Sequence, residues 1–154
     1  FMEIWIDGDA CPREVREVVY KAALRVKIIV NYIANKVHNI PKYDILKMIV
    51  VDGSLDAADS YIVENLSEGD LVITSDILFA GEALKKKAFV INTRGMEYHH
   101  HNIGEKIATR NLLSELRDQG VVSSYSPSFS KKDLQQFAQG FDRMLSRALN
   151  LKKT

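Results

Sequence analysis

Apolar residues in this 154-residue chain follow two spacings, short continuous runs and recurrence every three or four positions. The continuous runs are rich in β-branched residues and predict strands at residues 3–6, 27–34, 47–51, 70–74 and 88–92. The helical spacing predicts helices between them at residues 12–25, 55–66 and 78–87. Residues 35–46 are polar and contain Pro41, so we expect a connection with at most a short helix. Such alternation predicts parallel strands joined by right-handed crossovers.

The pattern changes after residue 92, where turn and polar residues come first and two helices follow. Residues 93–95 predict a turn and residues 98–101 a polar connection. Asn102 with Glu105 resembles a capping box and starts a helix that ends near Gly120. A Ser-rich loop at 121–129 precedes a second capping pair, Ser130 with Asp133. The predicted buried face of the last helix is Leu134, Phe137, Phe141, Leu145 and Ala148.

Together these elements predict the α/β class, as one domain over residues 1–154. We expect a three-layer open parallel sheet in which the strands, numbered along the chain, stand in the order 3-2-1-4-5. The two C-terminal helices should pack on this sheet as an appendage.

Composition narrows the class of protein but not its function. A hydrophobic fraction of 46% is ample for one buried core, and a net charge of +1 indicates no particular partner. Cys11 is the only cysteine, which excludes an intrachain disulfide and a Cys-rich zinc site. No apolar run approaches the ~18 residues of a membrane span, and no charged leader precedes the first strand. We therefore expect a cytoplasmic protein without a membrane partner; the sequence leaves its oligomeric state open.

Aspartates follow two of the predicted strands. Asp7 and Asp9 end the first strand, and Asp76 follows the fourth. If the first strand is central, with the second strand on one side and the fourth on the other, these carboxylates converge at the carboxyl edge, where open α/β sheets bind ligands. Asp56 and Asp59 share a helix face through their i, i+3 spacing and can project toward the same edge.

Four or five carboxylates in one cleft repel each other unless a cation neutralises them. Oxygen-only ligands suit Mg²⁺ or Mn²⁺, which keep several waters and accept phosphate oxygens. A structural interpretation also exists for single residues, because Asp9 could favour a helix dipole and Asp56 could be a helix cap. The joint placement of all five at corresponding element ends favours a site.

The chain resembles a known family at several long, ordered motifs. These are residues 7–12 (DGDACP), 22–25 (AALR), 53–59 (GSLDAAD) and 69–76 (GDLVITSD), followed by Arg94-Gly95. They resemble the YaiI/YqxD family, a group of uncharacterised bacterial proteins placed among the PIN-like domains. The similarity extends through Arg110 and residues 133–137.

The resemblance implies a PIN-like fold and a possible nuclease site. PIN-like nucleases hold one or two metals with acidic residues after the first strand, at a mid-chain helix and after the fourth strand. Matched by position, these are Asp7, Asp59 and Asp76, with Asp9 and Asp56 in support. The implied chemistry is attack of metal-activated water on a phosphodiester of RNA or single-stranded nucleic acid.

Some positions depart from what the resemblance leads us to expect, among them Phe79 near a usual proline and Ser126-Pro127 in place of Gly-Pro. Gly8 stands where alanine is usual, and Asn111 follows Arg110 where an aspartate is common. Asn111 would weaken the acidic cluster if that position belongs to the site.

Other polar residues are weaker candidates. Arg94 and Arg110 could clamp a phosphate or pair with the site carboxylates. Asn35 and Lys36 follow the second strand and are candidate substrate-binding residues. Cys11 could be a nucleophile at a helix start, but a small buried residue is the favoured interpretation.

Three functions compete. The first is a divalent-metal-dependent nuclease. The second is a non-catalytic PIN-like module that binds RNA or a protein. The third and weakest is a phosphatase of the haloacid-dehalogenase type, suggested by Asp7-x-Asp9 and by Thr74 or Ser75. That class also needs a lysine and a late acidic pair, and no Asp-Asp pair occurs in the sequence.

Overall fold

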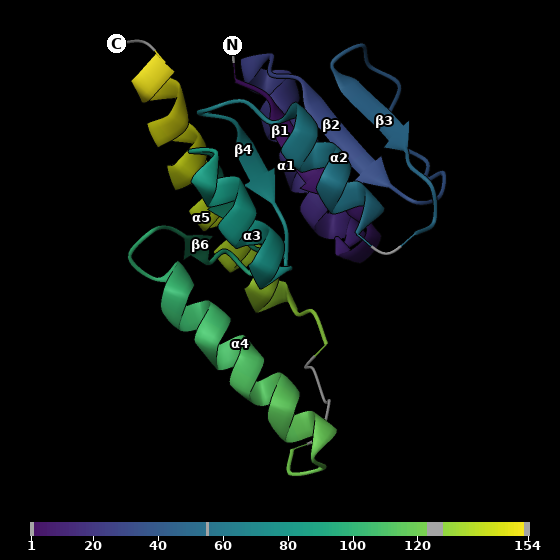
Figure 1. Cartoon of the computed structure of the whole chain (residues 1–154). Coiled ribbons are helices and arrows are strands. Elements are labelled where there is room, and N and C mark those ends of the chain that lie inside the picture. Colours follow the sequence, from purple (N-terminus) through teal and green to yellow (C-terminus); the bar gives the residue numbers. More distant parts are fainter. Residues whose placement is uncertain (1, 55, 123–127, 153–154) are drawn as a thin grey trace.

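The computed structural model describes residues 2–54, 56–122 and 128–152 and contains one six-stranded sheet between helices (Figure 1). The strand order is β3-β2-β1-β4-β5-β6. The strands are β1 (Ile4–Asp7), β2 (Val30–Ala34), β3 (Leu46–Val50), β4 (Leu71–Ile73), β5 (Phe89–Ile91) and β6 (Glu97–Tyr98). The first five are parallel, which confirms the predicted order 3-2-1-4-5.

The strand β6 was not predicted. It pairs antiparallel with β5 after a turn in which Gly95 has a φ of +91°. The turn itself was expected at residues 93–95. A strand of two residues carries too little periodicity to be recognised in a sequence, which explains why residue 98 was assigned to a polar connection.

Helices cover both faces of the sheet. They are α1 (Arg13–Val26), α2 (Ala57–Asn65), α3 (Ile77–Lys85), α4 (Ile103–Asp118) and α5 (Lys131–Lys152), with a short 3₁₀ helix η1 (Gly8–Ala10) after β1. Successive side chains of β1 point to opposite faces of the sheet. Ile4 and Ile6 pack in the hydrophobic cluster that includes residues of α1 and α5. Trp5 packs in the cluster that includes residues of α2 and α3. The sheet is therefore the middle of three layers, as predicted.

The predicted second strand was too long at its beginning. Residues 27–34 were assigned to it, but α1 continues to Val26 and Lys27 ends the helix with a φ of 60°. The helix predicted at residues 55–66 begins at Ala57, and Leu55 lies outside the described residues.

The two C-terminal helices differ in how they pack. In α5 four of the five residues of the predicted face are buried, with Phe137, Phe141, Leu145 and Ala148 each at most 2% exposed, and Leu134 is half-buried. The predicted capping pair forms, because Asp133 N donates to Ser130 Oγ and Ser130 N to Asp133 Oδ2. By contrast, α4 contacts α3, has no buried residue and extends away from the sheet in Figure 1.

The predicted capping box of α4 is wrong. Asn102 occupies the N-cap position, but its side chain makes no cap hydrogen bond. Its Oδ1 instead accepts from His99 N, and its amide donates to the carbonyl of Glu97. Of the loop predicted at 121–129, residues 123–127 lie outside the described ranges. None of the helices within those ranges is long and apolar enough to cross a membrane.

Candidate metal centre

Five aspartates line one cavity of about 430 Å³ at the carboxyl edge of the sheet. They are Asp7, Asp9, Asp56, Asp59 and Asp76, and the other lining residues are small or polar: Asn35, Gly53, Ser54, Ala57 and Ala58. The cavity lies where the sequence predicted it, because β1 is flanked by β2 on one side and by β4 on the other. Among its described lining residues none is lysine or arginine.

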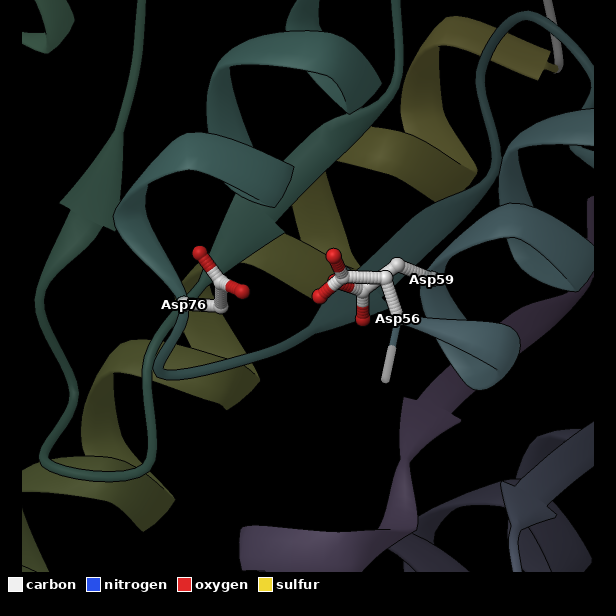
Figure 2. A group of neighbouring side chains, drawn as sticks. All are labelled: Asp56, Asp59 and Asp76. Atoms are coloured by element: carbon white, nitrogen blue, oxygen red, sulfur yellow. The ribbon is translucent and has the colours of Figure 1, made fainter. Parts of the chain in front are cut away.

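Three carboxylates form the tightest group within this cavity. Oxygens of Asp56, Asp59 and Asp76 all lie within 4.8 Å of one another. Figure 2 shows Asp56 and Asp59 side by side, with Asp76 facing them from the other side. The sequence assigned Asp7 to the shared metal with Asp59 and Asp76, and Asp56 to a supporting role. The structure places Asp56 in the tightest group and Asp7 beside it in the cavity wall.

The backbone explains why Asp56 reaches the cavity. It directly precedes α2 in the left-handed conformation, with φ 65° and ψ 13°, which aspartate tolerates better than most residues. Its side chain makes no cap hydrogen bond, so the alternative interpretation of Asp56 as a helix cap is wrong. Asp59 follows in the first turn of α2.

Asp76 has two roles in the local structure. Its Oδ1 accepts hydrogen bonds from the backbone N–H groups of Leu78 (3.0 Å) and Phe79 (3.2 Å), which caps α3. The sequence did not assign Asp76 as a cap. Because a carboxylate has two oxygens, Oδ2 is left to face the other aspartates.

Hydrogen bonds hold the remaining acids of the cavity. Asp9 lies in η1, and its Oδ1 accepts from the backbone N–H of Asn35 at 2.9 Å, which joins the ends of β1 and β2. Asp7 Oδ2 accepts from the hydroxyl of Thr74 at 3.0 Å. The same hydroxyl accepts from Asp76 N at 3.0 Å. The sequence noted Thr74 only for the phosphatase alternative; its role in joining two strand-end acids needed the sheet register.

Burial and the close packing of the aspartates raise the pKa of two of them. Burial is the largest cause that raises the pKa of Asp59 to about 7, and the charges of the neighbouring aspartates add to it. Burial also raises the pKa of Asp7, while the hydrogen bond from Thr74 opposes this. Without a cation, the cavity therefore holds a proton near neutral pH.

The cavity suits Mg²⁺ or Mn²⁺ by the chemistry of its donors. Its ligands are hard carboxylate oxygens, and metal–oxygen bonds of 2.0–2.1 Å place two ligands of one ion at most about 4.2 Å apart. The observed limit of 4.8 Å is close enough for small side-chain rotations to satisfy this requirement.

The predicted substrate-binding residues lie in different places. Asn35 lines the acidic cavity, and Lys36 follows it as an exposed residue. Arg94 donates to Asp133 at 2.7 Å and does not line the cavity. Arg110 is exposed on α4, where its guanidinium donates to Asn111 Oδ1 at 3.1 Å. Within the described residues, the ion pair of Arg94 is with Asp133 and the hydrogen bond of Arg110 is with Asn111, so neither of these contacts involves a site aspartate.

Cys11 is half-buried, not fully buried as predicted, and packs against the core cluster that includes α1 residues. Burial raises the pKa of the thiol to about 12, which keeps it protonated at neutral pH.

A second, larger cavity of about 620 Å³ shares Asp56, Asp59 and Asp76 with the acidic one and continues between α2 and α3. Its walls include the apolar residues Val63, Phe79 and Ile107 together with the charged Glu64, Glu82 and Lys85, so a groove of mixed character with an apolar part borders the carboxylates.

An open, mostly parallel α/β sheet with acids at the carboxyl edge is consistent with a PIN-like fold. Residues 5–147 match the sequence model described as "Uncharacterized BCR, YaiI/YqxD family". The chain belongs to this family.

Similar proteins occur in several Pseudomonas species and are named only as UPF0178 proteins. That of Pseudomonas aeruginosa (strain UCBPP-PA14) is 40% identical over 146 residues, covering 95% of this chain and 91% of the relative. That of Pseudomonas fluorescens (strain Pf0-1) is 42% identical over 146 residues, covering 95% and 97%. No solved structure matches the chain. The family is uncharacterised, so the relatives assign no activity.

Proposed function

We propose that this protein is a divalent-metal-dependent nuclease that hydrolyses phosphodiester bonds of RNA or single-stranded nucleic acid. The observation that carries the proposal is the convergence of five aspartates on one cavity whose described lining contains no basic side chain. A structural role accounts for Asp76 as a cap, but not for a pKa near 7 at Asp59.

The residues around the two cavities have separate roles in the proposed reaction. Asp56, Asp59 and Asp76 would hold the first cation, with Asp7 and Asp9 beside it to complete its shell or hold a second one. A bound Mg²⁺ or Mn²⁺ supplies a nucleophilic water and neutralises the phosphate charge. The hydroxyl of Thr74 fixes the orientation of Asp7. The apolar part of the groove between α2 and α3 offers a surface for the sugar and base next to the reacting phosphate.

The alternatives fit these observations less well. A haloacid-dehalogenase-type phosphatase also needs a late acidic pair, and no Asp-Asp pair occurs in the sequence. A non-catalytic binding module has no use for a carboxylate cluster that costs electrostatic repulsion. It remains the alternative that the following assay distinguishes.

The test is cleavage of a panel of single-stranded RNAs with Mn²⁺ by wild type, Asp59→Asn and Asp118→Asn. Asp118 is an exposed residue at the end of α4 and serves as a matched control. We expect wild type and Asp118→Asn to cleave equally, and Asp59→Asn to lose at least about a hundredfold in rate. Equal cleavage by all three, or cleavage by none, contradicts the proposal. A parallel assay with a small phosphate ester separates the phosphatase alternative.

A further inference from the structure

A separate cavity of about 240 Å³ lies between α1 and residues 39–41. One face of α1 supplies Arg13, Arg16, Glu17 and Tyr20 to its wall, at the i, i+3, i+4 and i+7 positions. The volume is below the about 300–1,000 Å³ of pockets for drug-sized ligands, so the cavity fits a small group.

Two buried polar atoms at this cavity have no hydrogen-bond partner among the described residues. They are Arg16 Nε and the hydroxyl of Tyr20, and Tyr20 is only 5% exposed. Burial raises the pKa of the Tyr20 phenol, so the group stays a neutral donor. Leaving a buried donor without an acceptor costs about 1–3 kcal/mol, which makes two of them at one cavity a mark of a ligand or a bound water.

The charge of Arg16 has no acidic partner within 4.0 Å in the described part of the chain. Its Nη1 instead donates to the Tyr32 hydroxyl at 3.1 Å and lies 3.3 Å from His38 Nδ1. Arg13 and Glu17 neutralise each other at the exposed mouth, with Nε and Oε1 3.2 Å apart. The cavity therefore carries one net positive charge, on a residue that is partly withdrawn from solvent.

A hydrogen bond connects this cavity to the acidic one. The hydroxyl that receives the Arg16 hydrogen bond, that of Tyr32, itself donates to the carbonyl of Gly8 at 3.1 Å. Gly8 stands between Asp7 and Asp9, which both line the acidic cavity. Two hydrogen bonds through the Tyr32 hydroxyl thus link a wall residue of this cavity to the segment that carries Asp7 and Asp9.

We propose that the cavity beside Arg16 and Tyr20 binds a phosphate group, supplied by the backbone of the nucleic-acid strand that also reaches the aspartates. A phosphate oxygen that enters between α1 and residues 39–41 would supply the acceptor that Arg16 Nε and the Tyr20 hydroxyl both lack. The identity of the strand rests on the proposed nuclease function, whereas binding of a phosphate group does not.

The first experiment titrates the metal-free protein with inorganic phosphate and follows the Arg16 Nε–H signal by ¹H–¹⁵N NMR. Loss of one Nε–H signal in Arg16→Lys assigns the resonance. We expect a saturable shift in wild type, weaker binding in Tyr20→Phe, and unchanged binding in Arg25→Gln. Arg25 is the matched control, since it lies on α1 outside the cavity in an exposed pair with Asp142. Absence of a saturable shift, as expected when water satisfies both donors, overturns the proposal.

The second experiment identifies the source of the phosphate. A fluorescent single-stranded oligoribonucleotide is bound in EDTA, without cleavage, at several salt concentrations. We expect Arg16→Gln to bind about tenfold more weakly and to lower the slope of log K against log salt by about 0.7, while Arg25→Gln changes neither. If inorganic phosphate binds but Arg16→Gln leaves the oligonucleotide affinity and slope unchanged, the strand assignment is overturned.

These readouts are independent of the aspartates. A protein that binds phosphate at Arg16 but cleaves no RNA contradicts the proposed function and leaves the anion site standing. If Arg16→Gln does not fold, Tyr20→Phe decides both titrations through the affinity alone, because it keeps the charge and removes only one hydroxyl that makes no hydrogen bond within the described chain.

Discussion

The hydroxyl of Thr74 donates to the carboxylate of Asp7 at 3.0 Å, across the boundary between β4 and β1. The same oxygen accepts from the backbone N–H of Asp76 at 3.0 Å. One buried hydroxyl therefore fixes two of the acids that the sheet brings together. Without it, Asp7 would lose the hydrogen bond that holds its pKa down against burial.

This relationship predicts the effect of Thr74→Val, which keeps the shape of the side chain and removes the hydroxyl. The pKa of Asp7 should rise, because its carboxylate loses a donor. Stability should fall by about 1–3 kcal/mol, since Asp76 N loses its acceptor. Mn²⁺ should bind more weakly at neutral pH. Denaturant unfolding and calorimetry measure both effects; unchanged metal affinity would show that Thr74 has only a structural role.

The raised pKa of Asp59 predicts a pH dependence with a definite sign. The unfolded carboxyl has a pKa near 3.8 and the folded one near 7, so between these values the folded protein holds the extra proton. Stability of the metal-free protein should therefore fall as the pH rises from 4 to 7. The raised pKa of Asp7 acts in the same direction.

Metal affinity should change in the opposite direction, because a cation competes with that proton. Mn²⁺ binding should strengthen as the pH rises and level off above about 7. Melting temperatures in EDTA and titrations across this range give both curves. In Asp59→Asn the stability slope should become shallower, and a slope equal to that of wild type would contradict the assignment to Asp59.

Asp76 provides a comparison of two substitutions at one position. Asparagine keeps the Oδ1 that caps α3 and removes a negative charge, so Asp76→Asn should preserve or raise the metal-free melting temperature. Alanine removes the cap as well, so Asp76→Ala should be less stable than Asp76→Asn by about 1 kcal/mol. Both should lose metal affinity. A loss of several kcal/mol in Asp76→Asn would mean that the residue is purely structural.

The structure explains why glycine occupies position 8. A Cβ at this position would lie 2.5 Å from Tyr32 Cζ and 2.8 Å from the carbonyl oxygen of Ile33. Gly8→Ala should therefore destabilise by about 1–3 kcal/mol through overpacking. The matched control is Gly53→Ala, where the added Cβ meets nothing within 4 Å. Unfolding curves that coincide for the two variants would contradict this explanation.

The sequence predicted the parallel sheet and the position of the site because both depend on local patterns. Apolar runs locate β1 and β4, and right-handed crossovers bring their carboxyl ends together. Local patterns do not reveal how a particular aspartate is satisfied. Asp70 precedes the same β4 that Asp76 follows, yet it is buried and accepts from Trp5 Nε1 and the backbone N–H groups of Glu3 and Ser67.

The remaining features depend on contacts between distant parts of the chain. Arg94 pairs with Asp133, which is 39 positions away and has no sequence signal that marks it as a partner. The tightest carboxylate group includes Asp56 because of a left-handed backbone, which a short polar segment does not reveal in advance. The cavity beside Arg16 needs the packing of residues 39–41 on α1.

The most direct test of the central claim is calorimetric titration of Mn²⁺ into wild type, Asp59→Asn and the control Asp118→Asn at neutral pH. The proposed metal centre predicts saturable, modest binding by wild type and Asp118→Asn, because few-carboxylate sites rely on substrate phosphate to complete the shell. Asp59→Asn should bind at least about tenfold more weakly. Equal binding by all three proteins, or no binding by wild type, would contradict a metal centre at these aspartates.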